Sequence, residues 1–207
     1  SYENRINDDV NYLSNDKLEG RKTGSNGEQI AADYIADRFK NLKIKAKGTN
    51  TYFQDFNFNK PSSPHDQASF DETENDTMIS SKNVIGYIDN NAEYTIVIGA
   101  HYDHLGYGGE GSLHVGSEIH NGADDNASGT ALMLDLASQL KFNNRNNNYL
   151  FIAFSGEEMG LLGSNYFVKN PTIDLSSINY MINLDMVGRL KEDKSLAIYG
   201  VGTSPIF

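Results

Sequence analysis

Four short motifs of acidic residues and histidine lie at the ends of apolar runs, and this pattern restricts the fold more than any other feature. Apolar runs of this length, bounded by Gly or Asn, are typical of buried parallel strands. Side chains just past the carboxyl ends of such strands meet in one crevice of an open α/β sheet, so we expect the motifs to converge there. The motifs are His101-Tyr102-Asp103 after YTIVIGA, Asp124-Asp125 in NGADDNASG, Glu157-Glu158 after YLFIAFSG, and Asp185 after INYMINL.

The alternation of strand and helix patterns from Tyr94 onward predicts an α/β fold. We expect a three-layer α/β/α domain with a largely parallel, mixed central sheet and helices on both faces. The 207 residues suit a single domain, 1–207, in which the polar segment 59–80 forms a loop or small insertion. Predicted helices span 2–15, a segment carrying Ala31 to Leu42, 128–140 and about 157–168; predicted strands span 51–58, 83–88, 94–100, 149–154, 180–184 and 196–199.

Composition excludes several classes of protein. The net charge of −11 argues against nucleic-acid binding, which needs a basic surface. No apolar stretch approaches the roughly 18 residues that a membrane-spanning helix needs. The chain has no cysteine, which excludes a thiolate metal site and a disulfide framework. It opens with Ser1-Tyr2-Glu3, without the pattern of a signal peptide.

In the segments GAHYDH, NGADDNASG, FSGEEMGLLGS and NLDMVGR the chain resembles the zinc-dependent exopeptidases of the M28 family, which are di-zinc aminopeptidases. The resemblance covers Leu13 to the C-terminus and implies two Zn²⁺ ions in a complete active site. It also implies the roles of the ligands. His101, Glu158 and Asp185 would each bind one zinc ion, and Asp124 would bridge the two ions. In the family, the Asp124–Asp125 peptide bond is expected to be cis.

Two further residues are predicted to assist the site. Adjacent side chains on a helix diverge, so Glu157 is free to act as the general base while Glu158 binds metal. Asp103 lies two residues after His101, on the same side of an extended chain. Its carboxylate is expected to accept the second ring N–H of His101 and to orient the ring.

For the other candidate residues, a purely structural role explains the sequence at least as well as a role in the site. Asp125 is as well explained by capping the turn at 126–128 as by a part in the site, and His104 is expected at the surface near His101. The remaining histidines, 65, 114 and 120, are expected in solvated loops. The segment 106–111 matches G-x-G-x-x-G but opens no helix, so a dinucleotide site is rejected. Tyr102, Tyr107 and Phe154 are equally consistent with a pocket lining and with core packing.

One element of the M28 pattern is missing, because no histidine follows Asp185. We therefore expect a portion of a longer enzyme, inactive as it stands, that lacks the last His ligand. The predicted function is a secreted or periplasmic zinc metalloaminopeptidase that hydrolyses peptides from the free N-terminus. A carboxypeptidase or dipeptidase could use the same site, and a one-zinc, glutaminyl-cyclase-like protein is a weaker alternative. A non-catalytic binding domain that retains the peptidase fold is the alternative from a different class.

Overall fold

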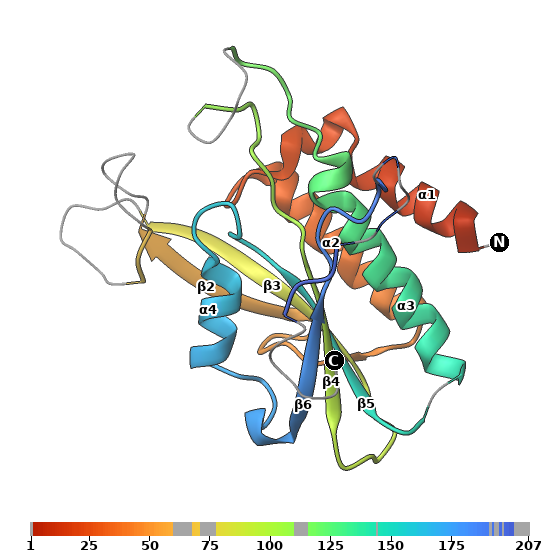
Figure 1. Cartoon of the computed structure of the whole chain (residues 1–207). Helices are drawn as coiled ribbons and strands as arrows, with labels where there is room; N and C mark the ends of the chain where they lie inside the picture. Colours follow the sequence, from red (N-terminus) through yellow and green to blue (C-terminus); the bar gives the residue numbers. More distant parts are fainter. Residues whose placement is uncertain are drawn as a thin grey trace.

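In the computed structural model, the protein has a mixed, open β-sheet flanked by helices, as predicted (Figure 1). The structure describes residues 2–59, 68–70, 78–109, 116–143, 145–190, 192, 195 and 197–200. The strands are β1 (Lys45–Ala46), β2 (Phe53–Asn59), β3 (Met78–Ile88), β4 (Thr95–His101), β5 (Asn148–Phe154) and β6 (Ile178–Asn183). The helices are α1 (Tyr2–Leu13), α2 (Asn26–Asn41), α3 (Gly129–Asn143) and α4 (Leu162–Lys169), with short 3₁₀ segments at Asp16–Arg21 and Leu175–Ser177.

The strand order is β1-β3-β5-β4-β6, with β2 also paired to β3. Strands β5, β4 and β6 are parallel, with Val97 opposite both Leu150 and Met181. The pairs of β3 with β1, β2 and β5 are antiparallel, so the parallel part of the sheet is confined to the half that carries the predicted motifs. All residues of β4 and β5 are buried, as expected for central strands.

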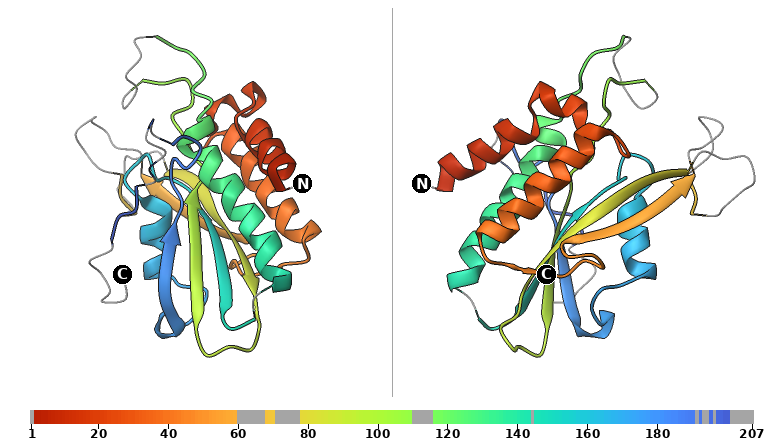
Figure 2. Two further views of the ribbon diagram at one scale, coloured as in Figure 1. Left: turned by 45° about the vertical axis from the view of Figure 1, so that its right-hand side comes forward. Right: turned by 180° about the vertical axis from the view of Figure 1, so that it is seen from behind.

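The sheet separates two helical layers (Figure 2). Helices α1, α2 and α3 cover one face, where Phe39, Phe151 and Met133 belong to the largest apolar cluster. Helix α4 covers the other face, where its Phe167 packs with Val97 and Leu150. No helix among the described residues is long and apolar enough to cross a membrane.

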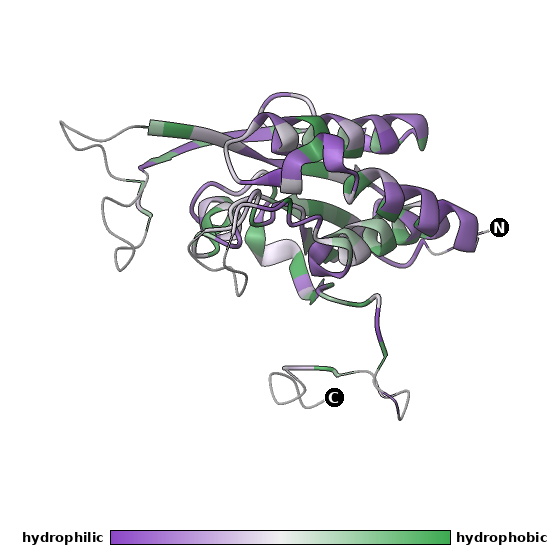
Figure 3. Ribbon diagram, turned by 90° about the horizontal axis from the view of Figure 1, so that it is seen from above, coloured by the Kyte–Doolittle hydropathy of each residue, from purple (hydrophilic) through white to green (hydrophobic). Residues whose placement is uncertain are grey.

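Helix α1 is hydrophilic along most of its length and is held to the other helices partly by charged contacts (Figure 3). The buried carboxylate of Asp9 accepts hydrogen bonds from Arg38 Nε at 2.7 Å and Nη2 at 2.8 Å. Arg5 donates to Asp135 on α3 at 2.7 Å. Ionised donors and acceptors form short, strong hydrogen bonds, which compensate for the few apolar side chains of α1.

Several predicted elements have different bounds or surroundings. Helix α4 begins at Leu162 and not near Glu157, because Gly156, Gly160 and Leu161 take positive φ values of 68°, 102° and 61°. Strand β6 is parallel as predicted, but its residues are mostly exposed, so the expectation of a buried strand is wrong there. Residues 197–199 are not in a strand, and residue 196 lies outside the described residues. Within the predicted loop 59–80, β3 already begins at Met78, and most of the remainder lies outside the described residues.

A buried carboxyl ties α2 to the sheet. Glu28 accepts from Gly24 N at 2.6 Å and from the hydroxyls of Ser81 on β3 and Ser155 after β5. Its own main-chain N–H donates to Ser25 Oγ, the cap that starts the helix at Asn26. The pKa of Glu28 is raised from 4.5 to about 8, first by burial and then by the nearby charge of Asp103, while the hydrogen bonds to the carboxylate oppose this rise.

This pKa predicts a pH dependence of stability that Glu28→Gln removes. The folded-state pKa lies above the unfolded value, so the contribution of Glu28 is complete below pH 4.5 and is lost as pH rises toward about 8. Across that window, its contribution to the free energy of unfolding falls by about 1.4 kcal/mol per pH unit at most. Urea unfolding between pH 5 and 8 should show a steeper fall for the wild type than for Glu28→Gln. The exposed Glu3→Gln is the control, and equal slopes for all three proteins would contradict the prediction.

Candidate metal centre

The parallel strands bring four of the predicted segments to one edge of the sheet. His101 ends β4, Asp125 lies in the turn before α3, Glu158 follows β5, and Asp185 follows β6. Among the described residues, two groups of donor atoms are close enough together to hold a metal ion, one around His101 and one around His104. The convergence follows from the parallel register of β4 with β5 and β6.

The first group consists of His101, Asp125 and Asp185. His101 Nε2 lies 3.2 Å from Asp125 Oδ1 and 3.6 Å from Asp185 Oδ1. With metal–ligand bonds near 2.1 Å at tetrahedral angles, two ligands of one zinc ion lie about 3.4 Å apart. These nitrogen and oxygen donors therefore fit a divalent cation in both chemistry and spacing.

The carboxylate of Asp125 is shared with the second group, which contains His104 and Glu158. Its Oδ2 lies 3.9 Å from His104 Nδ1, while its Oδ1 belongs to the first group. His104 Nδ1 lies 2.8 Å from Glu158 Oε1. One carboxylate with an oxygen in each of two donor groups is the arrangement that a bridging ligand requires.

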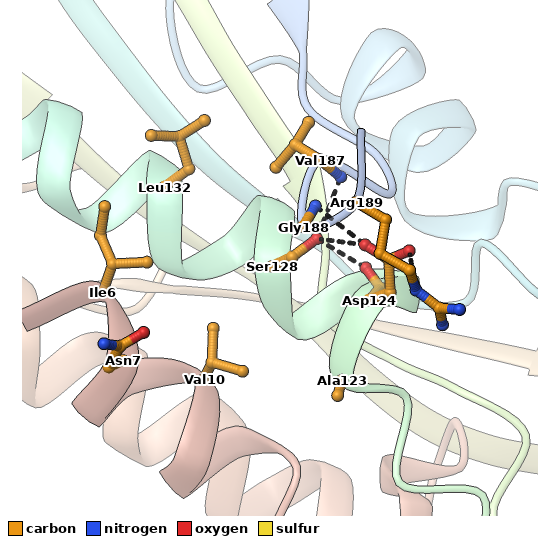
Figure 4. Close-up of a pocket in the computed structure, with 10 residues that line it drawn as sticks. All are labelled: Ile6, Asn7, Val10, Ala123, Asp124, Ser128, Leu132, Val187, Gly188 and Arg189. Atoms are coloured by element: carbon orange, nitrogen blue, oxygen red, sulfur yellow. Dashed lines mark hydrogen bonds and ion pairs between the residues drawn. The ribbon is translucent and has the colours of Figure 1, made fainter. Parts of the chain in front are cut away.

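The structure does not bring Asp124 into either group. Asp124 Oδ1 accepts from Gly188 N at 2.9 Å, and its Oδ2 pairs with Arg189 Nε at 3.1 Å (Figure 4). These contacts hold the segment after Asp185 against the turn before α3, beside a cavity of about 430 Å³. The residue shared by both donor groups is Asp125, for which the sequence favoured a turn cap equally, and not Asp124, for which the bridging role was expected. The cis peptide bond likewise lies at Asp125–Asn126, one residue later than expected.

The ring of His101 forms its hydrogen bond with the main-chain oxygen of Asp103 and not, as the sequence predicted, with the carboxylate. The His101 Nδ1 atom lies 3.2 Å from the main-chain oxygen of Asp103 and 3.6 Å from its carboxylate. The carboxylate itself accepts from the main-chain N–H groups of Glu157 at 3.1 Å and Glu158 at 3.3 Å, and from Thr23 Oγ1 at 2.9 Å. Asp103 therefore connects the end of β4 to the turn that follows β5.

Glu157 and Glu158 lie in that turn, so the helical argument for their divergence is wrong. Burial raises the pKa of the half-buried Glu157; the positive charge of His101 opposes this, and neighbouring carboxylates such as Asp103 add to it. A carboxylate with a raised pKa beside a cation site is suited to accept a proton.

The carboxylates around His101 give the site a negative charge that favours a bound cation. Burial by itself would lower the pKa of His101, but the interactions of its ring with the carboxylates of Asp103, Asp125 and Asp185 raise that pKa to about 12. The hydrogen bond to His101 lowers the pKa of Asp125. Carboxylates gathered in this way stabilise positive charge among them, whether as a proton or as a metal ion.

A sequence profile of peptidase family M28 matches residues 83–206, more than half of the chain. The chain belongs to peptidase family M28. The alkaline phosphatase isozyme conversion protein of Escherichia coli is 28% identical over 186 residues, which are 89% of this chain and 51% of that protein. Aminopeptidase YwaD of Bacillus subtilis is 44% identical over 77 residues, 36% of this chain and 16% of that protein.

Solved structures of similar fold include enzymes of two kinds. A Zn-dependent exopeptidase from Parabacteroides distasonis has a TM-score of 0.67 at 21% identity, covering 91% of this chain and 61% of that one. The glutaminyl cyclase of Tannerella forsythia gives the same values. These likenesses concern the fold. The chain spans about half the length of the Escherichia coli relative.

Two residues that support the site were not anticipated. Asn126 is fully buried and donates to the main-chain oxygens of His101 and Leu184, at 3.2 and 2.9 Å. It thereby fixes the ends of β4 and β6 relative to each other. Only its place inside NGADDNASG marked it in the sequence.

Arg21 is the second unanticipated residue, and its guanidinium is buried. It donates to the main-chain oxygens of Tyr102 at 2.7 Å, Asn121 at 2.8 Å and Gly122 at 3.0 Å, and also to that of Leu13. Burial lowers its pKa to about 10, against the charges of Asp103 and Asp125, so it remains cationic near neutral pH. Arg21 joins the His101 motif to the loop that leads into Asp125.

The other candidates are placed as follows. Tyr102 is buried and donates to Lys82 O at 2.7 Å, and Phe154 is also buried, so both are core residues. Tyr107 is exposed, and residues 106–109 form no helix. His104 is buried, so its expected surface position is wrong. His65 and His114 lie outside the described residues, and His120 lies near His104 with 6.4 Å between ring centres.

The contrast between the two aspartates gives a direct prediction. Asp125→Asn should reduce bound zinc to less than one ion per chain, because the charged oxygens common to both donor groups are lost. Asp124→Asn, the matched control, should retain the wild-type zinc content, since its contacts lie outside the donor groups. Metal content after dialysis against limiting zinc, measured by mass spectrometry, decides between them. The reverse result would restore Asp124 as the bridging residue.

Arg21→Lys should destabilise the fold despite keeping the charge. A lysine ammonium cannot reproduce the planar fork, and the unpaired buried carbonyls should together cost about 3 kcal/mol or more. Denaturant unfolding measures this loss. The control Lys45→Met removes an exposed ion pair with Asp89 and should cost less than about 1 kcal/mol. A similar small loss for Arg21→Lys would refute the structural role of the guanidinium.

Proposed function

We propose that the protein containing this chain is a metallopeptidase that uses two zinc ions to hydrolyse peptides at the N-terminus. The observation that carries the proposal is the carboxylate of Asp125, which faces His101 with one oxygen and the group of His104 and Glu158 with the other. Membership of family M28 supports a peptidase, and the aminopeptidase of Bacillus subtilis supports action at the N-terminus.

Each residue has a distinct part in this reaction. His101 and Asp185 would hold one cation, Glu158 would hold the other, and Asp125 would hold both. A pair of zinc ions held by these residues would supply Lewis-acid chemistry, namely activation of water and polarisation of the scissile carbonyl group. Asp103 keeps His101 and the turn of Glu157 and Glu158 in fixed relative positions through its four contacts.

Glu157 would act as the general base. Its raised pKa, caused first by burial, allows it to accept the proton of the attacking water and to return it to the leaving amine. A non-catalytic binding domain would have no use for a carboxylate tuned in this way beside a donor set of this kind. A glutaminyl-cyclase-like activity is the second candidate, favoured by the similar fold of the Tannerella forsythia enzyme.

Three expectations from the sequence stay predictions. They are secretion or export to the periplasm, inactivity of the chain 1–207 on its own, and completion of the site by a histidine beyond Asp185. A carboxypeptidase or dipeptidase also remains an alternative that activity measurements must decide.

The test uses the whole protein with zinc, a peptide that has a free N-terminus, and the same peptide N-acetylated. An aminopeptidase cleaves only the first substrate. Cyclisation of an N-terminal glutamine without cleavage would instead establish the second candidate function.

Glu157→Gln should lower kcat about 10²- to 10⁴-fold, because the amide cannot accept a proton. Zinc content should stay at the wild-type value, since Glu157 is outside both donor groups. Turnover and metal content are measured on the same preparation. Wild-type turnover in the variant would show that another group is the base.

A further inference from the structure

His104 lies inside the site, although the sequence favours a surface position. Only 8% of its surface is exposed, and its Nδ1 atom lies 2.8 Å from Glu158 Oε1. Two roles are compatible with this position: a metal ligand, or a hydrogen-bond donor that orients a metal ligand. The distances distinguish them.

Two ligands of one tetrahedral zinc ion are about 3.4 Å apart. The distances of 3.2 and 3.6 Å from His101 to Asp125 and Asp185 lie on either side of this value. The distances from His104 do not fit it. The separation of 2.8 Å from Glu158 is that of a charge-assisted hydrogen bond, and Asp125 Oδ2 is 3.9 Å away.

We propose that His104 is a positioning residue, which donates its Nδ1–H to Glu158 Oε1 and orients this carboxylate to hold the second cation. The inference rests on the proposed two-cation function. Ring nitrogen Nδ1 carries a hydrogen in the charged imidazole and in one neutral tautomer, so the hydrogen bond does not require a charged histidine.

The surroundings hold the imidazole ring of His104 in place. Its main-chain N–H donates to Arg21 O at 3.1 Å. The ring packs against Gly122, where an added Cβ would come within 2.6 Å of His104 Cδ2. Gly122 has a φ of 56°, so a side chain is disfavoured there by both conformation and space.

Glu158 is consequently held at two points. Asp103 accepts its main-chain N–H at 3.3 Å, and His104 contacts its carboxylate. Both partners come from the segment that directly follows His101, the proposed ligand of the first cation. The segment 101–104 thus serves both cation positions, the first by direct ligation and the second by orienting Glu158. Such outer contacts typically change metal affinity by about 10- to 100-fold.

The test compares His104→Ala, His104→Asn and His104→Gln in the whole protein. The amide nitrogen of Asn takes nearly the place of Nδ1, whereas that of Gln takes nearly the place of Nε2. Stepwise Zn²⁺ dissociation constants are measured by competition with a chelator, with circular dichroism as the check on folding.

We expect the Ala variant to weaken the second zinc ion by about 10- to 100-fold and to leave the first unchanged. The Asn variant should restore most of this loss, and the Gln variant should not. His120→Ala is the matched control, because His120 is a neighbour of His104 that belongs to neither donor group. We expect the His120→Ala protein to bind both zinc ions with wild-type affinity.

Three results would overturn the proposal without affecting the first cation site. One is wild-type affinity for both ions in His104→Ala. Another is equal loss in the Ala and Asn variants together with the loss of one imidazole ligand from the X-ray absorption spectrum, which would make His104 a ligand. The third is a wild-type protein that binds a single zinc ion. A wild-type protein that binds no zinc would overturn the proposed function as well.

Discussion

The carboxylate of Asp103 is the contact on which the arrangement of the site depends. It lies at the end of β4 and accepts the main-chain N–H groups of Glu157 and Glu158 after β5. A buried carboxylate without partners would be costly, so these donors and Thr23 are needed for the fold as much as for the site. The same contacts set the relative positions of a proposed ligand, His101, and a proposed base, Glu157.

Around this contact, main-chain groups near the site are held by buried polar side chains. Arg21 donates to the carbonyl groups of Tyr102 and Gly122, and Asn126 joins the ends of β4 and β6. Donors of this kind fix a segment without adding negative charge to a site that already contains several carboxylates. Their burial also makes them expensive to replace, because each carbonyl would lose its partner away from water.

The sequence motif that contains Asp124 and Asp125 does not determine which of the two side chains faces the site. Both are acidic, adjacent and part of the same M28 pattern, yet one faces Gly188 and Arg189 and the other faces the two histidines. A turn directs neighbouring side chains in different directions, and its backbone angles are not evident in the residue types. The same reason explains Glu157 and Glu158, which a helical pattern placed wrongly because Gly156 and Gly160 end the regular structure.

Hydrophobic periodicity predicted the fold class and the edge of the sheet where the motifs would meet, because periodicity is a property of neighbouring residues. The family came from the resemblance of four short motifs to those of M28 peptidases. Neither the periodicity nor the motifs could predict that His104 would be buried against Glu158, that β6 would be exposed, or that Arg21 would bridge two distant loops. The contacts of His104 with Glu158 and of Arg21 with Asn121 join residues that are 54 and 100 positions apart in the chain. Such contacts arise from the packing of strands and loops around the crevice, and no local pattern in the sequence encodes them.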